Sequence, residues 1–509
     1  MNLIKSTGTF SFYTILSRIL GYLRDFLIAL NLGSGPITDA FFVAFRIPNT
    51  FRRLFSEGTF NSAFVPSYSS ELEKSKIKAH EFSNQVFNFL VFSLLAITLL
   101  IELFMPLFVY LIAPGFTNNG DKFELTIMLT RITFPFLFFI SLASFFSAIL
   151  NSHNKFGIAA AAPIILNVVL ILILIFLKLE DDNLVIYLAY GISLAGLIQL
   201  IILLLFVKKY FIPKISLNIN FGKNIKLFFK KLIPSIFSSG VTQINILIGT
   251  IIASFQANAV SYLYYADRIY QINLAIAGIA IGTVLLPSLS KFIQTSNKRK
   301  IRIIQNKSVE LSLFLSLPAM LALLIASEEI TSSLFGYGSF DQINVKNSAS
   351  ALFYFALGLP AFAIIKIFSA FLFARHNTKI PFYFSLASVT LNILISVTFF
   401  NKIGFIIIPI STSLSSWINV LLLFYYLRIK NYYSLDLSSL FINLKTICSA
   451  LISSYFFYYM VTNYSSYLDY DSKYKLIFLI IMILLTFFIY ILIATLTKAF
   501  KFSDIKLKY

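Results

Sequence analysis

Five arginines lie within the first two apolar stretches of the chain, where a lipid environment would disfavour charge. The first stretch, SRILGYLRDFLIALNLG, runs from Ser17 to Gly33 and contains Arg18, Arg24 and Asp25. A charge at the centre of a bilayer costs ~2.5–3.5 kcal/mol on insertion scales, so such side chains normally face a protein interior or an aqueous cavity. Guanidinium groups stay charged and bind phosphate or carboxylate oxygens through paired hydrogen bonds. The chemistry that these residues offer is therefore the binding of an anion.

A helical arrangement would gather the polar residues of this stretch on one side. At ~100° per residue, five small or polar residues share an arc of roughly 120°. They are Ser17, Arg18, Gly21, Arg24 and Asp25. Bulky apolar residues fill most of the remaining surface. We expect one side to face lipid or protein and the other to face a polar, anionic ligand.

The second stretch, TDAFFVAFRIPNTFRRLFSEGTF, contributes more charge. Its polar side chains are Asp39, Arg46, Asn49, Arg52, Arg53 and Glu57. Pro48 disturbs the helical register and predicts a bend. A structural network of ion pairs, Arg24 with Asp25 and Arg53 with Glu57, could instead hold helices together. Across both stretches, however, five arginines outnumber three carboxylates, and this surplus of positive charge favours an anionic ligand.

Composition places the two stretches in a longer series of membrane segments. Of 509 residues, 58% are hydrophobic and 12% are charged, and the mean hydropathy is +0.84. These values indicate an all-α polytopic membrane protein. Fourteen segments have the ~20 residues needed to cross a bilayer. They are 10–32, 37–65, 84–112, 123–150, 158–177, 184–207, 232–255, 260–289, 304–326, 347–373, 380–400, 404–427, 441–462 and 475–497.

Lysine and arginine are divided unevenly between the connecting loops. With the N-terminus inside, 25 of them fall on the cytoplasmic side and 6 on the opposite side. Short cytoplasmic loops are rich in these residues, so the split supports the fourteen segments and places both termini in the cytoplasm. The net charge of +20 then follows from topology and requires no nucleic-acid partner.

The two halves of the chain repeat each other at an offset of about 222 residues. Arg46 and Arg268 each begin an Arg-Ile pair, VPSYS resembles LPSLS, SHNK resembles RHNTK, and Asn167 corresponds to Asn392. The repeat unit holds six segments, an even number, so both copies have the same orientation. We therefore expect two pseudo-symmetric six-helix lobes and two further C-terminal helices. The expected parts are an N-lobe at 1–207, a cytoplasmic amphipathic linker at 208–231, a C-lobe at 232–427, and the last two helices with the tail at 428–509.

The sequence offers little for metal, cofactor or covalent chemistry. The chain has a single cysteine, Cys448, and three histidines, His80, His153 and His376, which all lie near segment ends. No Walker-type glycine-lysine motif is present, nor a nucleophile constellation. We expect no cofactor, no metal site and no enzymatic activity.

Several motifs resemble one family closely. SRILGYLRDFLIA, ITDAFFVAFRIPNTFRRLFSEGTFNSAFVPSY, RITFPFLFFISLASFFSAILN, LYYADRIYQ and GTVLLPSLSK are similar to the MurJ (MviN) family of the multidrug/oligosaccharidyl-lipid/polysaccharide exporter superfamily. Members are bacterial inner-membrane flippases. They move lipid II, the undecaprenyl-diphosphate-linked peptidoglycan precursor, from the cytoplasmic to the periplasmic leaflet.

The resemblance implies a set of functional residues and an alternating-access mechanism. The implied substrate-binding residues are Arg18, Arg24, Arg52 and Arg268. The supporting cavity residues, by the same resemblance and by their charge at membrane depth, are Ser17, Asp25, Asp39, Arg46, Asn49, Arg53, Glu57 and Lys366. The last two helices would border a groove for the lipid tail. The implied partners are lipid II, membrane lipids and the cell-wall synthesis machinery, with the protein as a monomer.

Three alternatives remain open at this point. A flippase for another polyprenyl-diphosphate-linked glycan needs the same diphosphate chemistry. A drug or cation antiporter of the same superfamily should display uncompensated acidic residues, whereas this chain displays arginines. A membrane enzyme lacks a catalytic constellation here. The driving force, whether membrane potential, ion coupling or a lipid gradient, is also left open.

Overall fold

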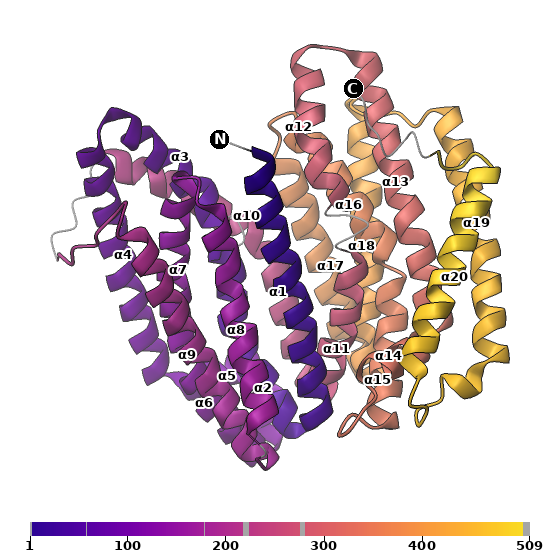
Figure 1. Ribbon diagram of the computed structural model, residues 1–509, viewed down its shortest axis with the longest axis horizontal. Coiled ribbons are helices and arrows are strands. Elements are labelled where there is room, and N and C mark those ends of the chain that lie inside the picture. Colours follow the sequence, from indigo (N-terminus) through magenta and orange to yellow (C-terminus); the bar gives the residue numbers. More distant parts are fainter. Residues whose placement is uncertain (1–2, 57–58, 178, 217–222, 275–279, 502–509) are drawn as a thin grey trace. The chain divides into compact units, whose positions relative to one another are not determined.

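Every regular element of the described chain is a helix (Figure 1). The computed structural model describes residues 3–56, 59–177, 179–216, 223–274 and 280–501. Within these ranges, eight helical stretches are long and apolar enough to cross a membrane, or nine if a bent pair counts as one span. The expected all-α polytopic membrane fold is confirmed. The count of fourteen spans stays a prediction, since the helices that carry Arg24, Arg46 and Arg268 are not among these eight.

The chain forms two compact units, Met1–Ser261 and Tyr262–Tyr509, which are described separately. The expected lobe boundaries stay predictions. The helices of the first unit are α1 (Leu3–Leu32), α2 (Pro36–Ser56), α3 (Thr59–Lys74), α4 (Lys76–Leu103), α5 (Met105–Ile112), η1 (Pro114–Asn118), α6 (Gly120–Thr133), α7 (Pro135–Ser152), α8 (Phe156–Phe176), α9 (Asp181–Val207), α10 (Lys223–Ala253) and the start of α11 (Ala259–Leu274).

The second unit begins within α11 and continues to the end of the chain. Its further helices are α12 (Ala280–Gln294), α13 (Lys298–Ile325), α14 (Ser327–Phe335), α15 (Gln342–Ala356), α16 (Leu359–Phe373), α17 (Lys379–Ile403), η3 (Gly404–Ile406), α18 (Ile407–Ile429), α19 (Leu437–Asn463), η4 (Ser465–Tyr467) and α20 (Lys475–Leu496). The two C-terminal helices α19 and α20, yellow in Figure 1, lie side by side.

Prolines divide three of the predicted spans into two helices each. Pro106, Pro135 and Pro360 lie in the first turn of α5, α7 and α16. Proline is tolerated there because the first turn of a helix needs no backbone N–H donor, whereas inside a helix it breaks the hydrogen-bond ladder. The spans 84–112, 123–150 and 347–373 are therefore built as α4–α5, α6–α7 and α15–α16.

The start of α10 belongs to the aromatic core of the first unit. Phe228 is buried, and its ring contacts those of Phe60, Phe64 and Phe82. The lysines Lys226 and Lys230 of the same helix turn are exposed. Residues 223–230, predicted as part of an amphipathic linker, thus form a helical segment with one buried and one exposed side.

The internal repeat is visible in equivalent contacts near helix ends. In the first unit the His153 ring stacks on the Tyr210 ring with a centroid distance of 4.3 Å. In the second unit the Arg375 guanidinium lies 4.6 Å from the centre of the Tyr432 ring. His153 and Arg375 are 222 residues apart in the sequence, and so are Tyr210 and Tyr432. The repeat read from short motifs therefore extends to side-chain packing.

Candidate functional site

Arg24 is buried on α1 and is held by three neighbouring groups. Its side chain donates from Nη2 and Nε to Oδ1 of Asp25, at 2.6 and 3.0 Å. Nη1 donates to Oδ1 of Asn167 at 3.0 Å, and the guanidinium lies 5.3 Å from the centre of the Phe45 ring. Arg24 and Asp25 are only 5% and 2% exposed. The structure thus places this arginine in a preorganised, charge-compensated arrangement.

Asn167 joins α8 to α1 at two positions. While its Oδ1 accepts from Arg24, its Nδ2 donates to the backbone oxygen of Ser17 at 3.0 Å. Gly21 lies between these contacts, and a Cβ atom there would be 3.7 Å from Nδ2 of Asn167. The structure therefore brings Ser17, Arg24 and Asp25 together as predicted for one helix side. Sequence reasoning used Asn167 only as a repeat marker. A lone asparagine within an apolar helix was the signal for a polar contact.

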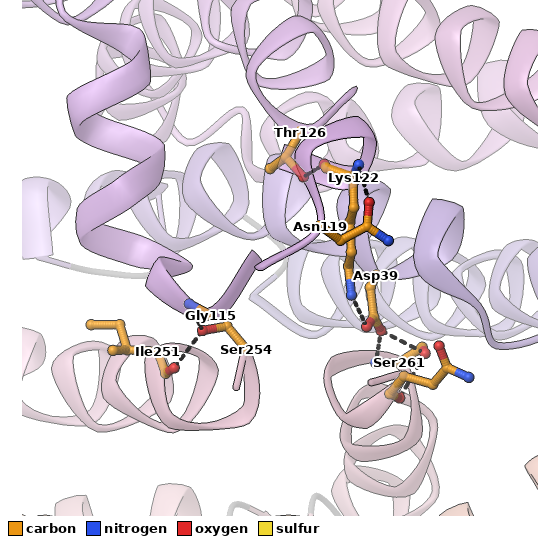
Figure 2. A network of polar contacts seen from close by, with 9 residues as sticks. Asp39, Gly115, Asn119, Lys122, Thr126, Ile251, Ser254 and Ser261 are labelled. Carbon is orange, nitrogen blue, oxygen red and sulfur yellow. Dashed lines mark hydrogen bonds and ion pairs between the residues drawn. The ribbon is translucent and has the colours of Figure 1, made fainter. Parts of the chain in front are cut away.

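A second buried polar network surrounds Asp39 at the start of α2 (Figure 2). Oδ2 of Asp39 accepts from Nζ of Lys122 on α6 at 2.7 Å. Oδ1 accepts from both the backbone N–H and the hydroxyl of Ser261 on α11, each at 2.8 Å. Asp39 has no exposed surface, and the Lys122 ammonium lies 3.8 Å from the centre of the Phe116 ring. The carboxylate thus ties together three helices that are distant in sequence.

Local backbone contacts support this network. Asn119 caps α6 by accepting from the backbone N–H of Lys122. The Gly115 N–H donates to the Ser254 hydroxyl at 3.0 Å, beside the Asp39 contacts in Figure 2. A Cβ atom at Gly115 would lie 2.4 Å from backbone atoms of Ser254. Only glycine permits this approach, which packs η1 against the end of α10. The predicted spans 84–112 and 123–150 leave Lys122 in the loop between them, so the sequence does not predict its contact with Asp39.

Arg46 makes a separate contact further along α2. Its Nη1 donates to the Thr250 hydroxyl on α10 at 2.7 Å, and the backbone oxygen of Ile246 lies at 3.5 Å. The guanidinium is half-buried. Arg24, Asp39 and Arg46 therefore have distinct hydrogen-bond partners within the first unit.

The other predicted residues of the first unit have varied surroundings. Arg18 is exposed, and Ser17 and Asn49 are half-buried. Arg52 and Arg53 lie on α2, but their side chains are outside what the structure describes, as is residue Glu57.

The second unit contributes two predicted residues. On α11, Nη2 of Arg268 donates to the Tyr264 hydroxyl at 2.8 Å, and the guanidinium lies 4.8 Å from the centre of that ring. Asp267 accepts a hydrogen bond from Gln271 on the same helix. Lys366 lies on α16 with an exposed side chain. Oδ1 of Asn392, the repeat counterpart of Asn167, accepts hydrogen bonds from Ser396 of α17 and Ser411 of α18.

No metal centre emerges from the described part of the chain, where no three His, Cys, Asp or Glu side chains gather closely enough to hold an ion. The chemical capacity of the arrangement is thus the binding and compensation of charge by arginines set in apolar helices.

Comparison with known proteins decides the family. A sequence model of the family described as "Lipid II flippase MurJ" matches residues 28–479. The chain belongs to this family. A relative from Rhizobium tropici, named "Probable lipid II flippase MurJ", is 40% identical over 432 residues, which cover 83% of this chain and 80% of the relative.

Solved structures agree with this membership. The structure titled "Lipid II flippase MurJ, inward closed conformation" has a TM-score of 0.82 at 29% identity and covers 96% of this chain and 98% of that chain. A multidrug resistance MATE family transporter of the MOP superfamily has a TM-score of 0.64 at 16% identity, over 81% of this chain and 94% of that chain. The second likeness shows a shared fold alone. The family resemblance predicted from the motifs is thereby confirmed.

Proposed function

We propose that the protein is a flippase that moves lipid II from the cytoplasmic to the periplasmic leaflet, for peptidoglycan and cell-wall synthesis. The observation that carries this proposal is the family match over residues 28–479, which includes the arginine-bearing helices α2 and α11 and the end of α1. Lipid II carries a diphosphate, which cannot cross hydrocarbon unaided. Guanidinium groups supply paired donors for its oxygens. Moving the lipid breaks no covalent bond, so we propose a transporter and not an enzyme.

In this proposal, Arg18, Arg24, Arg52 and Arg268 bind the diphosphate headgroup while the lobes alternate between the two sides. Arg18 is exposed. Arg24 is already oriented by Asp25 and Asn167, so a phosphate oxygen must join or replace these acceptors. The remaining cavity residues adjust the charge around them. Moving an anion outward from a negative cell interior is favourable by ~2.3 kcal/mol per charge for each 100 mV of membrane potential.

The proposed setting is the bacterial inner membrane, with the protein acting as a monomer without cofactor. The last two helices, α19 and α20, would border the lipid tail. Contact with the cell-wall synthesis machinery is a further part of this proposal.

Topology supplies a first test. A reporter fused within residues 208–231 should be cytoplasmic, and one within 463–474 should be periplasmic, because loop lysines and arginines concentrate on the inner side. Fusions are assayed with a periplasm-active enzyme and a cytoplasm-active fluorescent protein. Two reporters on the same side of the membrane would exclude the proposed fourteen-span topology.

Depletion of the protein supplies a functional test. Cells that rely on this chain should accumulate lipid II when it is depleted, because synthesis continues while export stops. Lipid-linked precursors are extracted and identified by mass spectrometry, with re-expression of the unmodified chain as control. Accumulation of a different polyprenyl-diphosphate glycan, with normal lipid II export, would instead identify the rival flippase function.

A further inference from the structure

A groove of about 460 Å³ lies on the first unit between α6 and α9. Its walls are mainly apolar, from isoleucines of both helices together with Met128 and Tyr190, which are 40% and 58% exposed. Two charged side chains, Glu124 and Arg131, also line it. None of the diphosphate-binding residues proposed above is among the lining residues.

Close packing on one side explains why the groove opens on the other. The Ser193 hydroxyl of α9 donates to the backbone oxygen of Ile132 at 2.5 Å. A Cβ atom at Gly196 would lie 2.7 Å from the Phe136 ring, so α9 also approaches α7, the helix that follows α6, closely. The groove residues of both helices come at or before these contacts in sequence. The groove therefore extends toward the ends at Gly120 and Asp181, which the charge distribution places on the outer side.

The two charged residues of the groove, Glu124 and Arg131, lie at different depths along α6. Arg131 follows Glu124 by seven residues on α6, which corresponds to a rise of roughly 10 Å. Helical side chains tilt toward the N-terminus, so the guanidinium extends back toward the carboxylate. Among the ion pairs of the described residues, none joins the two. Glu102 of α4 is close enough to attract the charge of Arg131, but it does not line the groove.

We propose that this groove binds a zwitterionic phospholipid of the outer leaflet, with its phosphate at Arg131 and its ammonium group at Glu124. The predicted span begins at residue 123, so Glu124 lies next to the headgroup region, whereas Arg131 lies roughly 10 Å deeper and can extend its long side chain back toward the headgroups. The apolar walls would contact the acyl chains.

Charge complementarity selects this lipid class. An anionic headgroup would satisfy Arg131 but bring its negative charge close to Glu124. A choline headgroup has a cation that cannot donate a hydrogen bond to the carboxylate. A headgroup that carries a phosphodiester and a primary ammonium can pair with both Arg131 and Glu124. The proposal does not depend on which lipid the protein transports.

Lipid titration of the full-length protein tests the proposal. The purified chain is delipidated in detergent and titrated with phosphatidylethanolamine, phosphatidylglycerol or phosphatidylcholine, and bound lipids are counted by native mass spectrometry. Phosphatidylethanolamine should bind most tightly. Arg131→Leu should weaken its tightest binding about tenfold, because a hydrogen bond to a charged group is lost. Glu124→Gln should weaken phosphatidylethanolamine binding while leaving phosphatidylglycerol binding unchanged or stronger.

Controls separate groove binding from general annular contact. Lys346→Leu removes an exposed charge from α15 in the other unit and should change no affinity. If Arg131→Leu fails to fold, the lipid selectivity of Glu124→Gln decides the matter alone. Equal affinity for the three lipids in the unmodified chain, or tighter binding of phosphatidylglycerol, would overturn the proposal. So would unchanged affinity in both groove variants.

Discussion

The double variant Arg24→Ala/Asp25→Asn is expected to regain the membrane abundance that Arg24→Ala alone loses, but not to regain transport. Removing Arg24 leaves the Asp25 carboxylate, 2% exposed, without the guanidinium that compensates it. Breaking a buried ion pair from one side costs about 3–5 kcal/mol. Neutralising Asp25 as well removes the unpaired charge, so folding should recover. The substrate role would not recover, because no guanidinium remains.

Arg24→Lys separates charge from geometry at the same position. An ammonium keeps the charge but lacks the planar fork that now binds Asp25 and Asn167 together. Two charge-assisted hydrogen bonds to a phosphate contribute about 3–6 kcal/mol, so we expect lipid II transport to fall at least about 100-fold. Abundance is measured by immunoblotting of membranes, and transport by lipid II accessibility in proteoliposomes.

A surface ion pair of the same chain provides the matched control. Arg302 and Asp436 lie 3.6 Å apart with side chains 60% and 36% exposed. Exposed pairs contribute about 0–1 kcal/mol, so Arg302→Ala should leave abundance and transport nearly unchanged. Restored transport in the Arg24/Asp25 double variant would show that the pair is only structural and would remove Arg24 from the proposed substrate site.

The sequence predicts the helix face of Arg24 and, as one interpretation, its ion pair with Asp25, but not its contact with Asn167. Helical periodicity places Ser17, Arg24 and Asp25 on one side of α1, as the structure shows. Periodicity cannot identify Asn167, because this contact joins residues 143 apart in sequence. The same limit applies to Lys122, which is 83 residues from Asp39. Such pairings depend on how helices pack, and a single sequence carries no direct signal of packing.

The fold was predictable to a similar degree. Hydropathy located the apolar segments because the bilayer imposes a minimum length on them. It did not predict that α4 and α5, or α6 and α7, would be separate helices, because the apolar composition continues across Pro106 and Pro135. The sequence predicts a bend at Pro48. In the structure, α2 continues through this proline, from Pro36 to Ser56.

Lys122→Met is expected to destabilise the first unit by about 3–5 kcal/mol, since it leaves the fully buried Asp39 carboxylate without its cation. Methionine keeps a side chain of similar length but removes the positive charge, and with it both the ion pair with Asp39 and the cation–π contact with the Phe116 ring. The midpoint of thermal unfolding in detergent should fall by several degrees. Lys346→Met, at an exposed position on α15, is the matched control and should leave the midpoint unchanged.

Combining Lys122→Met with Asp39→Asn should restore most of this stability. The asparagine oxygen can still accept from the backbone N–H and hydroxyl of Ser261, which lie 2.8 Å from Oδ1 of Asp39. Ser261→Ala should cost only about 1 kcal/mol, because the backbone donor remains. If the double variant is no more stable than Lys122→Met, the loss comes from packing and not from an uncompensated carboxylate.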